Sequence, residues 1–110
     1  TVVSAIDAVV AAAEEGKVPF LMADPTSLRF GPALATGFDY YQHGLLAGDI
    51  VLQILGGKKP SEIPVKYQTG AEIHLNLDAA ARIGLTFPAS LIDRATGIYF
   101  GGYPWLKSNG

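Results

Sequence analysis

The chain has 110 residues, of which 49% are hydrophobic, and it carries a formal net charge of −2. That length suffices for one small domain and is too short for two. Because no block of Lys and Arg occurs, the sequence argues against a nucleic-acid surface. The absence of Cys excludes disulfides, thiolate metal sites and thiol nucleophiles.

No apolar run approaches the roughly 20 residues that a membrane-spanning helix needs. Thr1 leads directly into an amphipathic helix, without the basic segment that opens a signal peptide. We therefore expect neither feature in the chain. Because the sequence starts inside a helical pattern and without Met, we expect it to have been processed or cut from a longer protein.

The sequence predicts alternating helices and strands, which indicates an α/β fold. In chain order, the predicted elements are a first helix that Gly16 ends, a buried parallel strand over Val18–Ala23, a loop over Asp24–Phe30, a strand of small residues over Ala33–Gly37 and a helix over Tyr40–Leu55; strands over Ile63–Tyr67 and Glu72–Leu77 and short helices over Ala79–Ile83 and Pro88–Arg94 follow. After Thr96 no period remains, so we treat residues 97–110 as an aromatic, glycine-rich tail.

Several helix ends carry recognisable caps. Ser4 and Asp7 have the spacing of a capping box, and Asp39 and Asp78 are suitable N-caps for the helices that follow them. Gly44 and Gly48 lie one turn apart in the long helix, which predicts a groove for close packing.

The residues give little support to an enzyme, a metal protein or a cofactor protein. H-E-x-x-H, G-x-S-x-G, a P-loop and G-x-G-x-x-G after a strand are all missing. His43 and His74 belong to no local motif, and we interpret them as a solvated helix residue and a polar-face strand residue. We therefore expect no catalytic residue, no metal and no cofactor.

Asp24 is the strongest candidate for binding a ligand. It follows a buried strand, where open α/β sheets hold their ligands. Its carboxylate could pair with a substrate ammonium, and Thr26 and Ser27 offer hydroxyl groups beside it. The alternative is an Asx-type turn in which Asp24 caps its own loop.

Aromatic and basic residues supply further candidates. Tyr40 and Tyr41 begin a helix next to the strand of small residues, where they could form the floor of an apolar pocket or serve as core aromatics. Arg29 could hold a ligand carboxylate, or its stem could cover Phe30 at the surface. The aromatic tail could contact a partner or fold back onto its own domain.

Five pieces of the sequence carry a resemblance to a known family. They are TVVSAIDAVVAAA, VPFLMADPTS, GPALATGFDYYQHG, ILGGKKPSEIPV and LNLDAAARIGLTFPASLIDRA. In this order and spacing they resemble the C-terminal third of the solute-binding proteins of ABC transporters, in the group that binds tryptophan and other aromatic amino acids. Pro32 and the tail from Gly97 depart from the family pattern.

The resemblance implies a fragment of the two-lobed fold of type I periplasmic binding proteins, an α/β fold with a parallel sheet and flanking helices. Residues 1–96 would be the C-terminal segment with parts of both lobes, and 97–110 the tail. The loop after the first strand would face the cleft, and the helix start at Asp39–Tyr40 would lie just past a crossing between the lobes. The resemblance therefore implies that Asp24, Thr26, Ser27 and Tyr40 bind the solute. Thr1, at a helix start, is a further candidate.

The same resemblance implies partners and a location. The partners would be a small organic solute, with amino acids among the candidates, an ABC permease, and the remainder of the full-length protein or another copy of the chain. The protein would be periplasmic or otherwise extracytoplasmic, with a lipid anchor as an option. Two alternatives stay open, namely the ligand-sensing domain of a signalling receptor and an α/β oligomerisation domain without a ligand.

Overall fold

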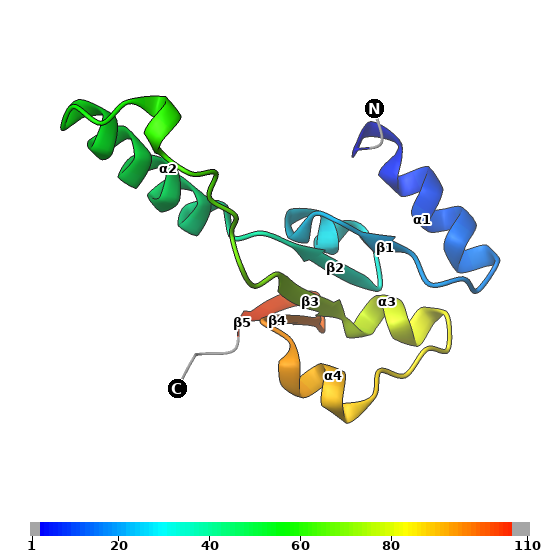
Figure 1. The fold of residues 1–110 in the computed structure, drawn as a ribbon. Helices are drawn as coiled ribbons and strands as arrows, with labels where there is room; N and C mark the ends of the chain where they lie inside the picture. The colour runs from blue at the N-terminus through cyan, green and yellow to red at the C-terminus, as the bar shows by residue number, and fades with distance from the viewer. Residues whose placement is uncertain (1–2, 107–110) are drawn as a thin grey trace. The chain divides into compact units, whose positions relative to one another are not determined.

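The computed structural model describes residues 3–106 and contains a five-stranded sheet with helices on its faces (Figure 1). Contacts divide the chain into two compact units. The first unit runs to Gly37 and resumes at Glu72, and it holds the whole sheet. The second unit comprises Phe38–Ala71 and holds the longest helix. The chain thus leaves the first unit after one strand and returns to it at another.

The described elements follow the chain in this order: η1 (Val3–Ala5), α1 (Ile6–Glu15), β1 (Leu21–Met22), η2 (Pro25–Phe30), β2 (Leu34–Gly37), α2 (Tyr40–Leu55), η3 (Pro60–Glu62), β3 (Glu72–Asn76), α3 (Leu77–Arg82), α4 (Ala89–Arg94), β4 (Gly97–Phe100) and β5 (Tyr103–Leu106), where η denotes a short 3-10 helix.

The sheet is mixed, and its strand order is β1-β2-β3-β4-β5. β1 and β2 pair in parallel, as do β3 and β4, whereas β2–β3 and β4–β5 are antiparallel. The predicted α/β class with flanking helices is confirmed, but the prediction of a parallel sheet is wrong in two of the four pairings. The β2–β3 connection passes through the whole second unit, and the β4–β5 connection is a tight hairpin. A tight hairpin makes consecutive strands antiparallel, and the β2–β3 connection, although it contains α2, also brings β3 back antiparallel to β2.

The core of the first unit lies between the sheet and the pair α3 and α4. It contains Ala33, Leu75, Ala80, Phe87 and Ala95. Leu75 is completely buried because β3 is central in the sheet and α3 and α4 cover this face. The opposite face carries η2 and α1 (Figure 1). Arg82 and Glu14 form an ion pair at 2.6 Å that links α3 to α1.

The tail is the largest difference from the sequence-based expectation. Residues from Gly97 on form β4, which extends the sheet beside β3, and β5, which pairs with β4. Gly101 and Gly102 connect the two strands, both with positive φ (63° and 78°). Two-residue hairpin turns of type I′ require this backbone conformation, and glycine adopts it without steric cost. Of the two options for the tail, the described part folds back onto its own unit.

Several local predictions are wrong. The strand predicted over Val18–Ala23 contains only Leu21–Met22, and Ile63–Tyr67 forms no strand. β1 has one neighbour in the described sheet, so its flanking residues lack a second partner that would hold them extended. The N-cap of α1 is Ala5, one position after the Ser4 that the sequence predicted, and Ala5 makes no side-chain capping hydrogen bond.

In the second unit, α2 has the predicted bounds. Asp39 is its N-cap, and the Asp39 carboxylate accepts the N–H of Tyr41 at 2.8 Å and of Gln42 at 3.3 Å. The loop after the helix returns along it, since Lys66 pairs with Asp49 and Gln68 donates to the Asp39 carbonyl at 3.1 Å. Polar contacts therefore hold this unit together.

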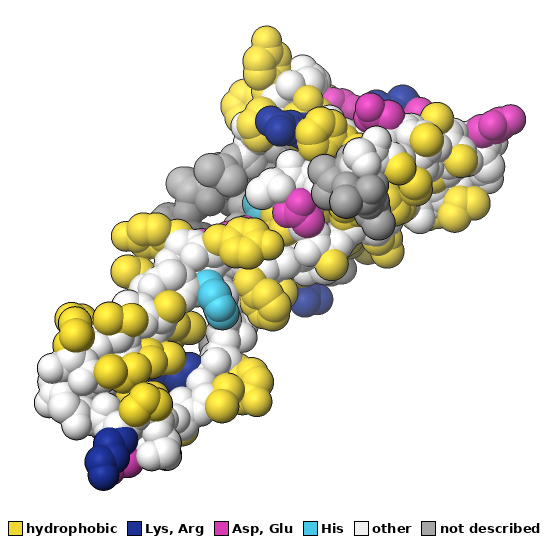
Figure 2. Space-filling view, turned by 90° about the horizontal axis from the view of Figure 1, so that it is seen from above, with side chains coloured by type: hydrophobic (Ala, Val, Ile, Leu, Met, Phe, Trp, Pro, Cys, Tyr) yellow, Lys and Arg dark blue, Asp and Glu magenta, His cyan; other side chains and the backbone are white. Residues whose placement is uncertain are grey.

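The apolar side of α2 has little cover within its unit. No residue of the helix is buried, and Leu52 and Leu55 are 69% and 78% exposed. Apart from the adjacent residues and the helix's own backbone, no atom of the described residues lies within 4 Å of a Cβ built at Gly44 or Gly48. The close packing predicted for this pair of glycines therefore does not occur within the unit. Figure 2 shows hydrophobic side chains spread over the exposed surface at the lower left, where the helix lies.

Candidate functional site

The loop that follows β1 gathers three of the predicted site residues around one carboxylate. Thr26 donates its hydroxyl to both Asp24 oxygens at 2.8 Å and its N–H to Oδ1 at 3.1 Å. The Ser27 hydroxyl donates to Oδ2 at 2.7 Å. Asp24 is thereby the N-cap of η2, with Pro25 as the first residue of that helix. The Asx-type turn is the arrangement that the structure contains.

These hydrogen bonds define the electrostatics of the loop. They lower the pKa of the Asp24 carboxyl below its ordinary value of 3.8. The Ser27 hydroxyl has the largest effect, burial comes second and raises the pKa, and the hydroxyl and N–H donors of Thr26 lower it further. At neutral pH, Asp24 therefore carries a full negative charge. Its side chain is half-buried, Thr26 is exposed, and Ser27 is 2% exposed. A solute could approach Asp24 and Thr26 from solvent, whereas Ser27 lies beneath them.

A hydrogen bond from Asn76 and a close approach at Gly37 hold this loop against the sheet. The Asn76 Nδ2 donates to the Leu28 carbonyl at 3.0 Å, and its Oδ1 accepts the Ala79 N–H at 2.9 Å as the N-cap of α3. A Cβ on Gly37 would lie 2.5 Å from Cδ of Pro25, so only glycine allows η2 to approach β2 this closely.

Sequence reasoning missed Asn76 because Asp78 carries the same capping signal. The prediction that Asp78 caps α3 is wrong. Asp78 instead accepts the N–H groups of Gly101 and Gly102, each at 3.0 Å. These two bonds lower the pKa of the Asp78 carboxyl, Gly102 having the largest effect. Asn76 directly follows an alternating strand and precedes a run of Ala, which is a usable N-cap signal.

Tyr40 belongs to the second unit, whereas Asp24, Thr26 and Ser27 belong to the first. It is the first residue of α2, and its side chain is 71% exposed. Tyr41 is equally accessible, so neither tyrosine is a core aromatic within that unit. Thr1 lies outside the described residues.

The remaining candidates have simple structural surroundings. The guanidinium carbon of Arg29 lies 4.7 Å from the centre of the Phe30 ring, which matches the surface alternative for Arg29. His43 is an exposed helix residue, as predicted. His74 lies within hydrogen-bond distance of Glu72, at 2.9 Å.

A metal-binding group and a membrane-spanning helix are both absent from the part of the chain that the structure describes. Between residues 3 and 106, no group of three or more His, Asp or Glu side chains could hold a metal ion. Over the same range, none of the helices combines the length and the apolar character needed to cross a membrane.

A sheet with helices on both faces and a polar loop after its first strand is an arrangement that suits a ligand-binding α/β protein. The family model for the ABC transporter substrate binding protein matches residues 1–98. The chain therefore belongs to the ABC transporter substrate-binding protein family, as its sequence pieces predicted. This is a family of solute-binding proteins and not of enzymes.

Among curated proteins, the chain is similar to the tyrosine-binding protein of Clostridioides difficile, with 32% identity over 77 residues. That match covers 70% of this chain and 22% of the relative. The chain thus spans less than a quarter of this relative's length.

Three solved structures have a similar fold. A conserved domain protein of Vibrio cholerae has a TM-score of 0.75 and 36% identity over 88% of this chain and 33% of its own. The ABC domain in complex with L-Trp from Streptococcus pneumonia has a TM-score of 0.74 and 24% identity over 89% and 34%. The ligand-free, open structure of a substrate binding protein with adhesive properties from Clostridium difficile has a TM-score of 0.70 and 25% identity over 90% and 32%. In each case the chain spans about a third of the solved chain.

Proposed function

We propose that this chain is part of a longer extracytoplasmic solute-binding protein that holds an aromatic amino acid between two lobes and delivers it to an ABC permease. The carrying observation is the family match over residues 1–98. The similarity to a tyrosine-binding protein and to a domain in complex with L-Trp supports an aromatic amino acid as the solute.

The surface of α2 supports the view that the chain works with further polypeptide. Its apolar residues include Tyr41, Leu45, Leu52 and Leu55, all more than half exposed in the described unit. Burying a leucine side chain contributes about 1.5–3 kcal/mol, so such a helix face is stable only when something covers it. We propose that the remainder of the full-length protein covers it, since the chain spans about a third of its structural neighbours.

We further propose roles for the four candidate residues. The carboxylate of Asp24 would attract the ammonium group of the solute, and the exposed hydroxyl of Thr26 would accept a hydrogen bond beside it. Ser27 would support both by holding the carboxylate in place through its 2.7 Å hydrogen bond. The exposed ring of Tyr40 would stack on the aromatic part of the solute.

The test is calorimetric titration of the full-length protein with L-tyrosine, L-tryptophan and L-leucine. Removing one aromatic stacking contact costs about 0.5–1.5 kcal/mol beyond the loss of buried area, so Tyr40→Ala should weaken binding of the aromatic solutes at least about tenfold. Tyr67→Ala is the matched control, because Tyr67 is even more exposed and belongs to the loop of the same unit. Binding of none of the three amino acids, or equal losses in both variants, would refute the proposal.

A further inference from the structure

A groove of about 410 Å³ lies on the η2 face of the first unit. η2 lines it with Pro25, Thr26, Leu28 and Arg29, and the β4–β5 hairpin lines it with Tyr99, Gly102 and Pro104. Small-molecule sites in proteins occupy about 300–1,000 Å³ and are mostly apolar with a few polar groups. The groove has this size and this composition.

The two walls of the groove are fixed by neighbouring residues at the start of α3. Asn76 is 2% exposed and binds the Leu28 carbonyl at 3.0 Å, which holds the η2 wall. Asp78 accepts the N–H groups of Gly101 and Gly102 at 3.0 Å, which holds the turn of the hairpin. Because both anchors belong to one short segment, the width of the groove is set before any ligand arrives.

The hairpin wall is a cross-strand pair. Tyr99 on β4 lies directly opposite Pro104 on β5, and residues opposite each other in an antiparallel pair project from the same face. Tyr99 is also in register with Asn76 on β3, whose side chain reaches η2. This register explains why Tyr99 lies on the η2 side of the sheet.

Arg29 is the only charged residue among the described residues that line the groove. Its guanidinium lies against the Phe30 ring, and it forms no ion pair with the residues that the structure describes. The nearby Asp24 carboxylate accepts hydrogen bonds from Thr26 and Ser27 instead. A guanidinium beside an apolar wall attracts a carboxylate, with which it makes strong bidentate hydrogen bonds.

We propose that this groove binds a small organic monoanion, with its carboxylate on Arg29 and its aromatic or aliphatic part on Tyr99 and Pro104. The family model ends at residue 98, so the hairpin wall lies beyond the matched segment. Tyr40 belongs to the other unit and does not line the groove. Thr26 lines the groove and is also proposed for the solute site, so the two sites adjoin. Arg29, Tyr99 and Pro104 have no part in the proposed solute site, and every lining residue of the groove belongs to the first unit.

Phenylacetate is a suitable probe, because it joins a carboxylate to one ring, and phenylacetamide is its neutral counterpart. Titration of the full chain, followed by the amide signals of the protein in NMR spectra, should give saturable shifts at Leu28, Tyr99 and Gly102. The amide probe should bind about tenfold more weakly, as should phenylacetate to Arg29→Gln, because each loses one charge-assisted contact. Tyr99→Ala should lower the affinity by a similar factor.

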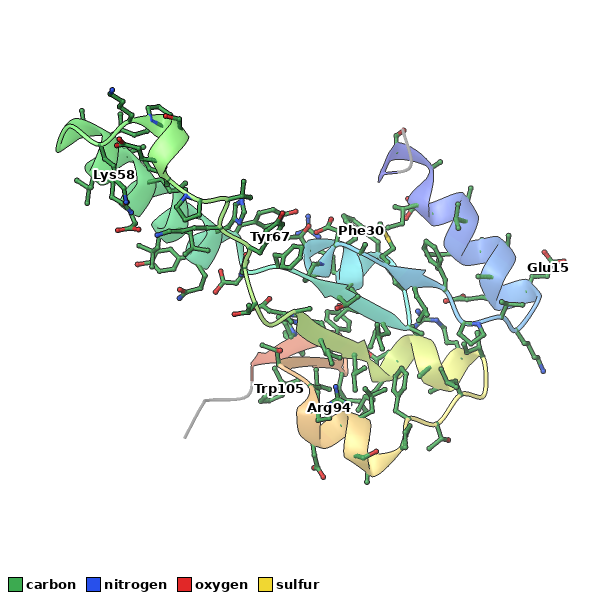
Figure 3. The ribbon with its side chains drawn as sticks, viewed as in Figure 1. Glu15, Phe30, Lys58, Tyr67, Arg94 and Trp105 are labelled. Atoms are coloured by element: carbon green, nitrogen blue, oxygen red, sulfur yellow. The ribbon has the colours of Figure 1, made fainter. Side chains whose placement is uncertain are left out.

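Matched controls separate the groove from general effects. Arg94→Gln removes an exposed arginine at the end of α4, on the opposite side of the sheet from Phe30 (Figure 3), and should leave the affinity unchanged. Tyr103→Ala removes an exposed tyrosine of β5 that does not line the groove, and it should likewise leave the affinity unchanged. Tyr40→Ala should also leave phenylacetate binding intact, whatever its effect on an amino-acid solute. Absence of saturable shifts in the wild-type chain, or equal affinity of Arg29→Gln, would overturn the proposal.

Discussion

Substitution of Ser27 by alanine tests how the candidate loop is held together. The Ser27 hydroxyl donates to Asp24 Oδ2 at 2.7 Å, and its side chain is almost completely buried. Ser27→Ala removes this donor, while both donors of Thr26 remain on the carboxylate. The change therefore isolates one hydrogen bond of the cap.

The expected magnitude follows from that geometry. A hydrogen bond to a charged group contributes about 1.5–3 kcal/mol, and water can partly replace this one because Asp24 is half-exposed. We expect the free energy of unfolding to fall by about 1 kcal/mol at neutral pH. In a domain of this size, that loss lowers the melting temperature by about 4–8 °C.

The pH dependence makes the prediction sharper. The Asp24 carboxyl has a lower pKa in the folded chain than its ordinary 3.8, so its contribution to stability is fully present above pH 3.8. That contribution is lost as the pH falls through the pKa of the folded state. Ser27 is the largest cause of the lowered pKa. The difference in free energy of unfolding between wild type and Ser27→Ala should therefore shrink as the pH falls through the folded-state pKa of Asp24.

Urea unfolding at neutral pH and at a pH below the folded pKa of Asp24 measures both effects. Ser90→Ala is the control, since Ser90 is exposed on α4, where alanine is the better helix former. The pKa of Asp24 itself can be followed by carboxyl NMR, and it should rise in the variant. A loss of stability that is the same at both pH values would refute the role of Ser27 as a donor to the carboxylate.

Three other substitutions probe the supports of the loop and the hairpin. Gly31→Ala should lower the free energy of unfolding by about 2 kcal/mol or more, because Gly31 has φ of 123° and a Cβ there would lie 2.5 Å from Val10 Cγ1. Urea unfolding should show a smaller loss when the same substitution is made together with Val10→Ala. An equal loss in that background would contradict the clash. Asn76→Ala should cost about 2 kcal/mol in the same assay, since it leaves a buried carbonyl without its donor and removes a helix cap. Asp78→Ala should speed hydrogen exchange at the two amides of the hairpin turn, and in the wild type their protection should decline as the pH falls through the lowered pKa of Asp78; unchanged exchange would count against this anchor.

Local signals predicted some elements well. The bounds of α2 follow from a capping Asp39 at one end and Gly56 at the other, both of which act through their nearest neighbours in sequence. The Asx-type turn of Asp24 was an explicit alternative for the same reason. Such features depend on a few adjacent residues, so one sequence suffices to identify them.

Long-range pairing was harder to predict. The direction of β3 depends on how the chain returns after the second unit, and no residue pattern near β3 encodes that. The hairpin was missed even though two glycines between aromatic residues are a usual turn signal, because the segment lacks a clear alternation of polar and apolar residues. For the candidate site, sequence proximity grouped Asp24, Thr26 and Ser27, whereas the support from Asn76 comes from 48 residues away in the chain.

The most direct test of the solute-binding account is a crystal structure of the full-length protein grown with L-tyrosine or L-tryptophan. The account predicts one amino acid whose ammonium group lies within hydrogen-bond distance of Asp24 or Thr26 and whose ring contacts Tyr40. It also predicts that the apolar face of α2 is covered by polypeptide from outside these 110 residues. An amino acid bound elsewhere, with the Asp24 loop and Tyr40 both facing solvent, would contradict it.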